Sequence, residues 1–296
     1  MSDLSAVKDA RDLRVVTLNF WGIEPPLDQR FALAVRQLRV LAPDVIAIQE
    51  CRPLDGVSGR TTADELADAL GMHARYEPSV SWQDGEYVGL PAGQEGLALI
   101  TRAPLLEVKT LALPEPRPAE ARLLLSGRVD TAGGPTWVHT THLHYRLDDG
   151  VAREQQVLAV DAAIRACGRG TTDAPQILCG DFNATPDSDE IRFLRGLTTL
   201  GGRRTHFQDA WLRLHREAEP GDGPAAGITW SSENELTRAL RSLDIDRRID
   251  FVFVTSRKKD GRGTVRRCDV TLRDRDAGIC ASDHYAVVAD IQVVAG

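Results

Sequence analysis

Short apolar runs alternate along the chain with longer segments in which apolar residues recur every three or four positions. The short runs are rich in Val, Ile and Leu, which is typical of buried β-strands. They predict strands at 14–18, 45–48, 96–101, 122–129, 136–141, 177–179, 247–254, 265–271 and 286–294. The helical spacing predicts helices at 28–41, 62–70 and 150–167, and a further helix behind Ser188.

The predicted strands form two groups, roughly one on each side of residue 150. Because strands and helices each bury one face, the two groups are expected to pack together with the helices outside. We therefore expect one domain over residues 13–296, built from two packed β-sheets. Residues 1–12 are polar and are expected to form a flexible N-terminus, while polar Gly- or Pro-rich loops are expected at 80–95 and 111–121.

Composition narrows the class of protein. The 296 residues include 36 Lys and Arg against 43 Asp and Glu, a net charge of −7. This balance argues against a protein that binds nucleic acid non-specifically along its length. It does not exclude an enzyme that contacts a few phosphates locally. The first twelve residues hold no apolar signal sequence, and no apolar run approaches the roughly 20 residues that cross a bilayer. Five cysteines without CxxC spacing indicate reduced thiols. We expect a cytoplasmic protein without a stable membrane anchor, and the sequence predicts no protein partner.

Residues 176–191, QILCGDFNATPDSDEI, place two polar side chains at the end of a strand. Asp181 and Asn183 are two residues apart, so they point the same way if the strand direction continues. A carboxylate can accept a proton from water while a carboxamide orients it, which suits a hydrolytic water beside a metal-bound oxyanion. Gly, Asp and Asn are also ordinary turn residues, so this segment alone leaves a simple strand-to-helix turn open.

Other predicted strands also end in polar residues. Asn19 and Glu50 lie one strand–helix–strand unit apart, and such a crossover places both strand ends at one edge of a sheet. Glu50 would offer the hard oxygen ligand that Mg²⁺ prefers. A later strand runs into His142 and His144, whose spacing allows both imidazoles to face one side. A turn asparagine, a solvated strand end or a structural histidine is the alternative for each residue taken alone.

Asp250 begins an apolar run, where a buried carboxylate costs several kcal/mol unless it is paired. His284, which follows Asp283 just before the last predicted strand, is the natural partner. A carboxylate that accepts from one imidazole nitrogen fixes the tautomer and raises the basicity of the other nitrogen.

Seven motifs occur in one order along nearly the whole chain from about residue 13. They are TLNFWG with Asn19, AIQE with Glu50, QEGLALITRAP, TTHL with His142, GDFNATPDSDEI, RRIDFVFV with Asp250, and SDHYAV with Asp283 and His284. In this combination the chain resembles the endonuclease/exonuclease/phosphatase superfamily of metal-dependent phosphoesterases, which is related to DNase-type nucleases and neutral sphingomyelinases. The resemblance implies an α/β four-layer sandwich, with two mixed, mostly antiparallel β-sheets face to face, helices outside, and the active site between the sheets.

The resemblance also implies residue roles. Glu50 would bind Mg²⁺ or Mn²⁺, with Asn19 and Asp283 close to the ion. Asp181 would orient or deprotonate the attacking water with the help of Asn183.

The histidines would act on the phosphate. His284, paired with Asp250, would bind phosphoryl oxygens or act as the base, and His142 would contact the phosphate or help the leaving group. Weaker candidates for substrate phosphate contacts are Arg122, Glu95 and His144.

The substrate is left open by the sequence. The first hypothesis is a nuclease-like phosphodiesterase, but the basic clusters are short and no long Lys/Arg stripe is present. LNFWGI and THLHY resemble the sphingomyelinase branch, yet no aromatic hairpin or amphipathic anchor for a phospholipid surface is apparent. A small-molecule phosphatase is the third reading, and a catalytically silent binding module is the non-enzymatic alternative.

Overall fold

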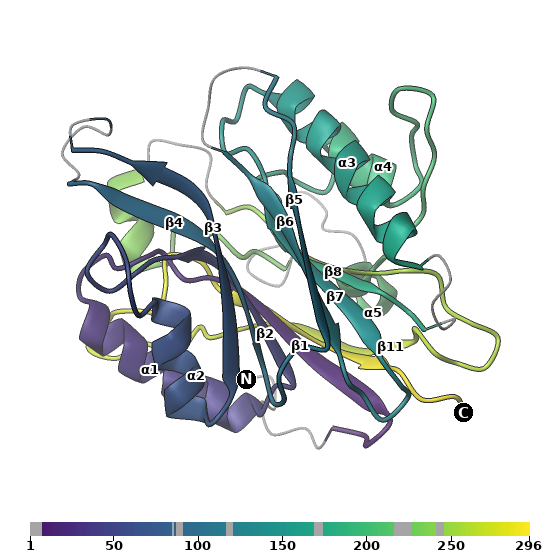
Figure 1. The fold of residues 1–296 in the computed structure, drawn as a ribbon, viewed down its shortest axis with the longest axis horizontal. Helices are drawn as coiled ribbons and strands as arrows, with labels where there is room; N and C mark the ends of the chain where they lie inside the picture. Colours follow the sequence, from purple (N-terminus) through teal and green to yellow (C-terminus); the bar gives the residue numbers. More distant parts are fainter. Residues whose placement is uncertain are drawn as a thin grey trace.

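The computed structural model describes residues 8–84, 86, 91–116, 121–168, 174–215, 227–240 and 246–296. Within these residues the chain forms two six-stranded β-sheets that lie face to face, with helices on their outer sides (Figure 1). Residues 1–7 of the expected flexible N-terminus lie outside the described residues, as do parts of the loops expected at 80–95 and 111–121.

The first sheet combines N-terminal and C-terminal strands in the order β11-β12-β1-β2-β4-β3. Its strands are β1 (Asp12–Asn19), β2 (Val45–Cys51), β3 (His73–Trp82), β4 (Gly93–Thr101), β11 (Val265–Thr271) and β12 (Ala286–Gln292). β1 runs parallel to β2 and antiparallel to β12. Because β1 and β2 are parallel, the polar residues at their ends emerge at the same edge of the sheet.

The second sheet comes from the middle of the chain, in the order β5-β6-β7-β8-β10-β9. Its strands are β5 (Glu107–Ala112), β6 (Leu123–Val129), β7 (Thr136–His142), β8 (Ile177–Asp181), β9 (Gln208–Asp209) and β10 (Asp250–Val254). The expected division of the sheets at residue 150 is therefore wrong. The chain leaves the first sheet after β4, completes the second, and returns to the first for its last two strands, and no local pattern encodes that return.

Apolar side chains form three layers, one between the sheets and one under each pair of helices. α1 (Leu27–Leu41) and α2 (Thr62–Leu70) cover the first sheet, and α3 (Gly150–Gly168) and α4 (Asp189–Leu194) cover the second. α5 (Ala210–Leu214) and the 3₁₀ helix η2 (Glu235–Leu240) are short. None of the helices in the described part of the chain is long and apolar enough to cross a membrane.

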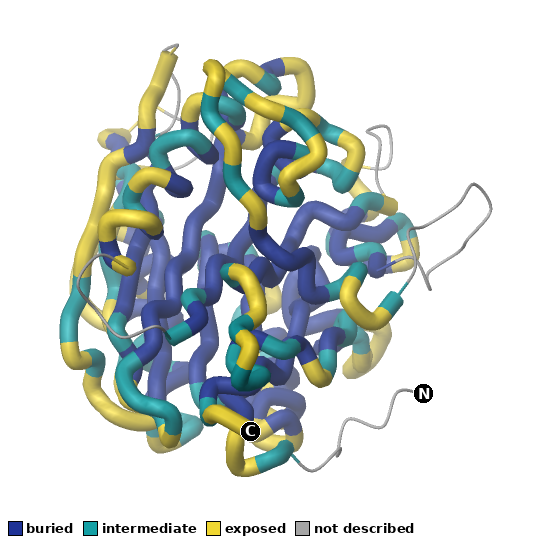
Figure 2. Tube along the Cα trace, turned by 90° about the vertical axis from the view of Figure 1, so that its right-hand side faces the viewer, coloured by how far each residue is buried: buried dark blue, intermediate teal, exposed yellow. Residues whose placement is uncertain are grey.

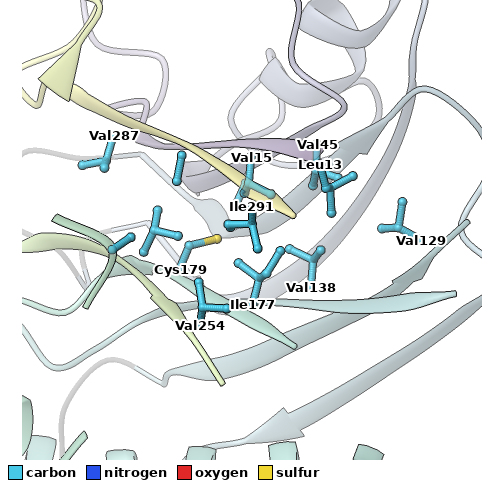
Figure 3. Close-up of a cluster of buried hydrophobic side chains, with 14 of the residues drawn as sticks. Leu13, Val15, Val45, Val129, Val138, Ile177, Cys179, Val254, Val287 and Ile291 are labelled. Carbon is cyan, nitrogen blue, oxygen red and sulfur yellow. The ribbon is translucent and has the colours of Figure 1, made fainter. Parts of the chain in front are cut away.

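Strand alternation explains how a single strand contributes side chains to two of these layers. Along β1, Leu13 and Val15 face the second sheet, whereas Val16 and Leu18 face the helices. Figure 3 shows the layer between the sheets, and Figure 2 shows that buried positions run through the middle of the molecule. The expected α/β sandwich of four layers is confirmed.

β3 and β5 were not predicted from the sequence. Both are edge strands of their sheets, and β5 has no buried residue. Pro78 interrupts the pattern of β3, and Glu107 and Lys109 stand on β5. Charged residues and proline are typical of edge strands, where they discourage pairing with another chain but remove the apolar signal.

Candidate active site

The polar residues at the strand ends continue the strand faces that line the inter-sheet core. On β8, Cys179 points into that core, so the next residue on the same face is Asp181. The same alternation aims Asn19 of β1, His142 of β7 and Asp250 of β10 into the space between the sheets. The site is therefore the polar end of the inter-sheet layer.

Glu50 breaks this alternation and reaches the site through a backbone irregularity. Its neighbour Gln49 faces the inter-sheet space, where its Nε2 donates to Thr140 Oγ1 at 2.9 Å, so a regular strand would turn Glu50 toward the helices. The register with β4 shifts between Ile48 and Cys51, and Glu50 itself has a φ of +52°. The bulge re-aims the carboxylate.

Gly180 and Asn183 fix the turn that carries Asp181. A Cβ on Gly180 would lie 2.0 Å from the carbonyl oxygen of Thr141, so only glycine lets β8 approach β7 here. The backbone N–H of Asn183, a residue with a φ of +50°, donates to Asp181 Oδ1 at 2.8 Å. Its side-chain amide donates to the carbonyl of Leu143 at 3.1 Å. These contacts leave Asp181 Oδ2 facing the histidines.

The strand ends surround a cavity of about 570 Å³. The predicted site residues that line it are Glu50, Glu95, Arg122, His142, Asp181, Asn183, Asp283 and His284. Asn19 and Asp250 are buried beside it and act on it through their partners. Residues that were not predicted also line it, among them Trp21, Tyr145, Arg146, Leu147, Trp230 and Arg247.

The expected pair of Asp250 and His284 is present. His284 Nδ1 lies 2.9 Å from Asp250 Oδ2, and its Nε2 lies 3.9 Å from Asp181 Oδ2. Burial alone would lower the pKa of His284, but the carboxylates of Asp250, Asp283 and Asp181 raise it well above its usual value. The imidazole is therefore held in its charged form, with one N–H directed at Asp250 and the other toward Asp181.

Two side chains that had no predicted role hold this pair in place. Thr229 Oγ1 accepts the backbone N–H groups of residues 249 and 250, both at 3.2 Å. Asn234 Nδ2 donates to the carbonyls of residues 282 and 283 at 2.8 and 3.0 Å. Both residues are fully buried in a connecting segment, where a lone Thr or Asn gives no signal that separates it from a turn residue.

The surroundings favour the charged form of His284 but the neutral forms of Asp181 and His142. Burial and the charge of Asp250 raise the pKa of Asp181 to about 6. His142 Nδ1 accepts from Arg122 Nη1 at 3.0 Å, and burial together with Arg122 and His284 lowers the pKa of His142 well below its usual value. His142 is therefore neutral, with its proton on Nε2, 3.5 Å from Asp181 Oδ2.

Two further carboxylates gather beside His142. Ligand atoms of Glu50, Glu95 and His142 lie within 4.8 Å of one another. Asn19 Nδ2 donates to Glu50 Oε1 at 2.8 Å and to Asp181 Oδ2 at 3.1 Å, so one amide joins the two groups. Burial and the charges of Glu95 and Asp283 raise the pKa of Glu50 well above its usual value. Such a set of mutually repelling oxygen donors fits a hard divalent cation.

His144 does not line the cavity. β7 ends at His142, so strand alternation does not continue to His144, and its contact with a substrate phosphate stays a prediction. The His144 ring is buried, with Nε2 3.6 Å from Asp149 Oδ2. His144 is thus a buried residue of the loop that follows β7.

Two stacked sheets with carboxylates, amides and imidazoles at one shared edge define an α/β sandwich of the phosphoesterase class. The chain belongs to the Endonuclease/Exonuclease/phosphatase family, whose model matches residues 16–284. A comparison with curated proteins gives no match.

Solved structures of similar fold include an endonuclease/exonuclease/phosphatase from Beutenbergia cavernae, 26% identical, with a TM-score of 0.69 over 96% of this chain and 72% of that chain. D. rerio TDP2, complexed with single strand DNA product, is 19% identical, with a TM-score of 0.67 over 95% of this chain and 98% of that chain. A mannosyl-6-phosphatase from Bacteroides thetaiotaomicron is 19% identical, with a TM-score of 0.64 over 94% and 99%. The last two likenesses concern the fold alone.

Proposed function

We propose that this protein is a divalent-metal-dependent phosphodiesterase in which Asp181 takes the proton of the attacking water. The observation that carries the proposal is the position of Asp181 Oδ2, which faces Nε2 of His142 at 3.5 Å and Nε2 of His284 at 3.9 Å. A phosphoryl group between these two imidazoles would stand beside a carboxylate base. The base and the two N–H donors then act on neighbouring atoms of one substrate.

Asp181 is suited to this task by its surroundings. A carboxylate with a pKa of about 6 is ionised at neutral pH yet is a stronger base than an exposed aspartate. The N–H of Asn183 and the amide of Asn19 fix its orientation. The side chain therefore needs little rearrangement when it receives a proton.

The two histidines are assigned to charge stabilisation. His284 is kept positive by Asp250, so its Nε2–H is a charged donor for a phosphoryl oxygen. His142 is kept neutral by burial and by Arg122, so its Nε2–H is a neutral donor. Preorganised donors of this kind stabilise the charge that develops in the transition state. Arg122 thus acts through His142 in this proposal.

Glu50, Glu95 and Asp283 are the side chains that would hold Mg²⁺ or Mn²⁺, with the carboxamide of Asn19 beside them. Glu95 is placed in this set because a carboxylate next to Glu50 repels a phosphate but binds a cation. When bound, such a cation neutralises charge on phosphoryl and leaving oxygens. The chain's own part is to keep these carboxylates close together at the cavity.

We propose a diester and not a monoester because of the size of the cavity. A cavity of about 570 Å³ is larger than a phosphate needs, and its lining continues past the histidines to Tyr145 and Trp230. The fold relatives do not decide the substrate, since one was solved with a DNA product and another is a mannosyl-6-phosphatase. A nucleic acid, a phospholipid head group and a small-molecule ester all remain within the proposed chemistry.

The test is hydrolysis of bis-p-nitrophenyl phosphate and p-nitrophenyl phosphate with Mg²⁺, with Mn²⁺ or with EDTA. The wild type is expected to prefer the diester and to need the metal, and Asp181→Asn is expected to lower kcat by about 10²- to 10⁴-fold. Asp187→Asn, which changes an exposed aspartate six residues away, is the matched control. Full activity of Asp181→Asn, or cleavage in EDTA, would contradict the mechanism.

Two other results would redirect the proposal. Preference for the monoester would indicate a phosphatase with the same site. No cleavage of either ester, combined with metal binding to the wild type, would favour the binding module.

A further inference from the structure

The loop between β7 and α3, residues 143–149, stands at the mouth of the cavity. Tyr145, Arg146 and Leu147 line the cavity although all three are exposed to solvent, Tyr145 by 45% and Leu147 by 47%. None of them belongs to the three apolar layers of the described fold. Exposed aromatic and aliphatic side chains beside an open cavity are typical of a binding surface.

The backbone of this loop is held from below by buried polar side chains. Gln156 Oε1 accepts the N–H of His144 at 2.9 Å. Arg153 Nη1 donates to the carbonyl of His144 at 3.4 Å and to that of Arg146 at 2.5 Å. Arg153 is itself anchored by an ion pair with the buried carboxylate of Glu190. The loop thus has a fixed backbone, while the side chains of Tyr145, Arg146 and Leu147 are exposed, which reduces the entropy that ligand binding would cost.

The outward side chains combine a ring with a cation. The guanidinium of Arg146 lies over the Tyr145 ring, 5.9 Å from its centroid. Trp230 also lines the cavity and stacks beside His284, with 6.3 Å between ring centroids. The lining next to the proposed phosphoryl position therefore includes two aromatic side chains.

We propose that Tyr145 and Arg146 are specificity-determining residues, which select phosphoesters with a flat unsaturated ring next to the phosphate and a second negative charge beyond it. The inference rests on the proposed function, which places the phosphoryl group at Asp181 and His284. Tyr145 offers its ring for stacking, and Arg146 pairs with the second anion. A long acyl chain fits less well, because the charges of Arg146 and Asp148 interrupt the apolar wall.

Binding calorimetry with Ca²⁺ in place of Mg²⁺ tests the ring through two matched pairs of ligands. These are methyl phosphate against phenyl phosphate, and deoxyribose 5-phosphate against thymidine 5′-phosphate. We expect the ring to tighten binding to the wild type by about 5- to 100-fold, because one aromatic stack has that value. Tyr145→Ala is expected to remove the difference. Val151→Ala, an exposed apolar residue outside the cavity lining, is the control and is expected to keep it.

Thymidine 3′,5′-bisphosphate tests the second anion. Its extra phosphate is expected to tighten binding by about 2- to 5-fold at low salt, since an exposed ion pair has that value. The gain should be lost in Arg146→Gln and at high salt, but kept in Arg36→Gln, which removes an exposed arginine from α1. Equal thermal unfolding temperatures would establish that all variants are folded.

The outcomes separate the sources of the ring and the two proposals. Ring preference in the phenyl pair alone supports aryl esters, and preference in the thymidine pair alone supports nucleoside phosphates. The inference would be overturned by equal affinities within both pairs, by an unchanged ring preference in Tyr145→Ala, or by no binding at all. Tighter binding of lysophosphatidic acid than of the ring-bearing phosphates would also overturn it. Ring-dependent binding without any hydrolysis would overturn the proposed function alone, whereas hydrolysis without ring preference would overturn this inference alone.

Discussion

Asp181 and Asp250 face each other across the antiparallel ladder of β8 and β10, one at the end of its strand and the other at the start. The single imidazole of His284 contacts both, Asp250 through Nδ1 at 2.9 Å and Asp181 through Nε2 at 3.9 Å. The strand register thereby places the two carboxylates on different nitrogens of one imidazole, so that they have different roles. Asp250 keeps the imidazole charged. Together with burial, the charge of Asp250 also makes Asp181 more basic than an ordinary aspartate.

Replacing Asp250 by Asn should uncouple His284. The amide leaves the imidazole without its charged partner, so the pKa of His284 should fall and kcat should drop by about 10²- to 10⁴-fold. The pKa can be followed by NMR titration of the His284 ring, and kcat with bis-p-nitrophenyl phosphate. An unchanged titration curve for His284 would show that Asp250 does not control its charge.

Asp181 should cost stability when no metal is bound. Its folded-state pKa of about 6 lies above the usual 3.8, so the folded state binds more protons and stability falls as the pH rises through this range. The penalty is absent below about pH 4 and complete above about pH 6, where it amounts to on the order of 3 kcal/mol. In EDTA, Asp181→Asn should therefore unfold at a higher temperature than the wild type at pH 8. At pH 4 the difference should vanish, and a variant that is less stable at pH 8 would contradict this explanation.

Mg²⁺ or Mn²⁺ should raise the unfolding temperature of the wild type. Burial, and to a lesser degree neighbouring carboxylates, raise the pKa of Glu50 and Asp283, and a bound cation would offset both effects. A concentration of 100 times Kd adds about 2.7 kcal/mol. Glu50→Gln should lose most of this response, while Glu154→Gln, a partly exposed carboxylate on α3, should retain it. Differential scanning fluorimetry with and without EDTA measures both.

The acid side of the pH–rate profile should report Asp181. Its base function requires the ionised form, so kcat/KM should rise with pH through an apparent pKa of about 6 or lower, since a bound cation favours the carboxylate further. The residual activity of Asp181→Asn should lack this rise. A profile that is flat between pH 4 and 7 in the wild type would assign the base elsewhere.

Gly180→Ala should damage both stability and activity. The new Cβ would meet the carbonyl oxygen of Thr141 at 2.0 Å, so β7 and β8 would have to separate at the point where they carry His142 and Asp181. A loss of about 3 kcal/mol or more in the free energy of unfolding is expected. Gly202→Ala, where nothing lies within 4 Å of the added carbon but φ is also positive, controls for backbone strain alone. Equal losses in both variants would remove the steric argument.

Much of the site follows from the sequence because strand alternation has a fixed period. Once a strand is placed, the alternation from Cys179 to Asp181 and from Val252 to Asp250 determines which side chains reach the inter-sheet space. Glu50 does not follow this rule, since its orientation depends on a bulge that is set by pairing with β4. The motif around it indicated a ligand, but its geometry required the sheet.

Other features depend on contacts that no local pattern carries. The edge strands β3 and β5 bury too little apolar surface to stand out, and the pairing of β12 with β1 joins residues 270 or more positions apart. Tyr145 and Arg146 are exposed loop residues, so neither periodicity nor apolar content separates them from ordinary loop positions. Their relation to the cavity depends on the buried side chains of Arg153 and Gln156.

The return of the chain to its first sheet sets an order of events during synthesis. β1 is made early, but its neighbour β12 and the residues just before it, Asp283 and His284, are made more than 260 residues later. A nascent chain that still lacks them has an uncovered β1 edge and no charged imidazole beside Asp181. The proposed site is therefore completed only after the C-terminal strand has been made, so a fragment that ends before Asp283 lacks two of its side chains.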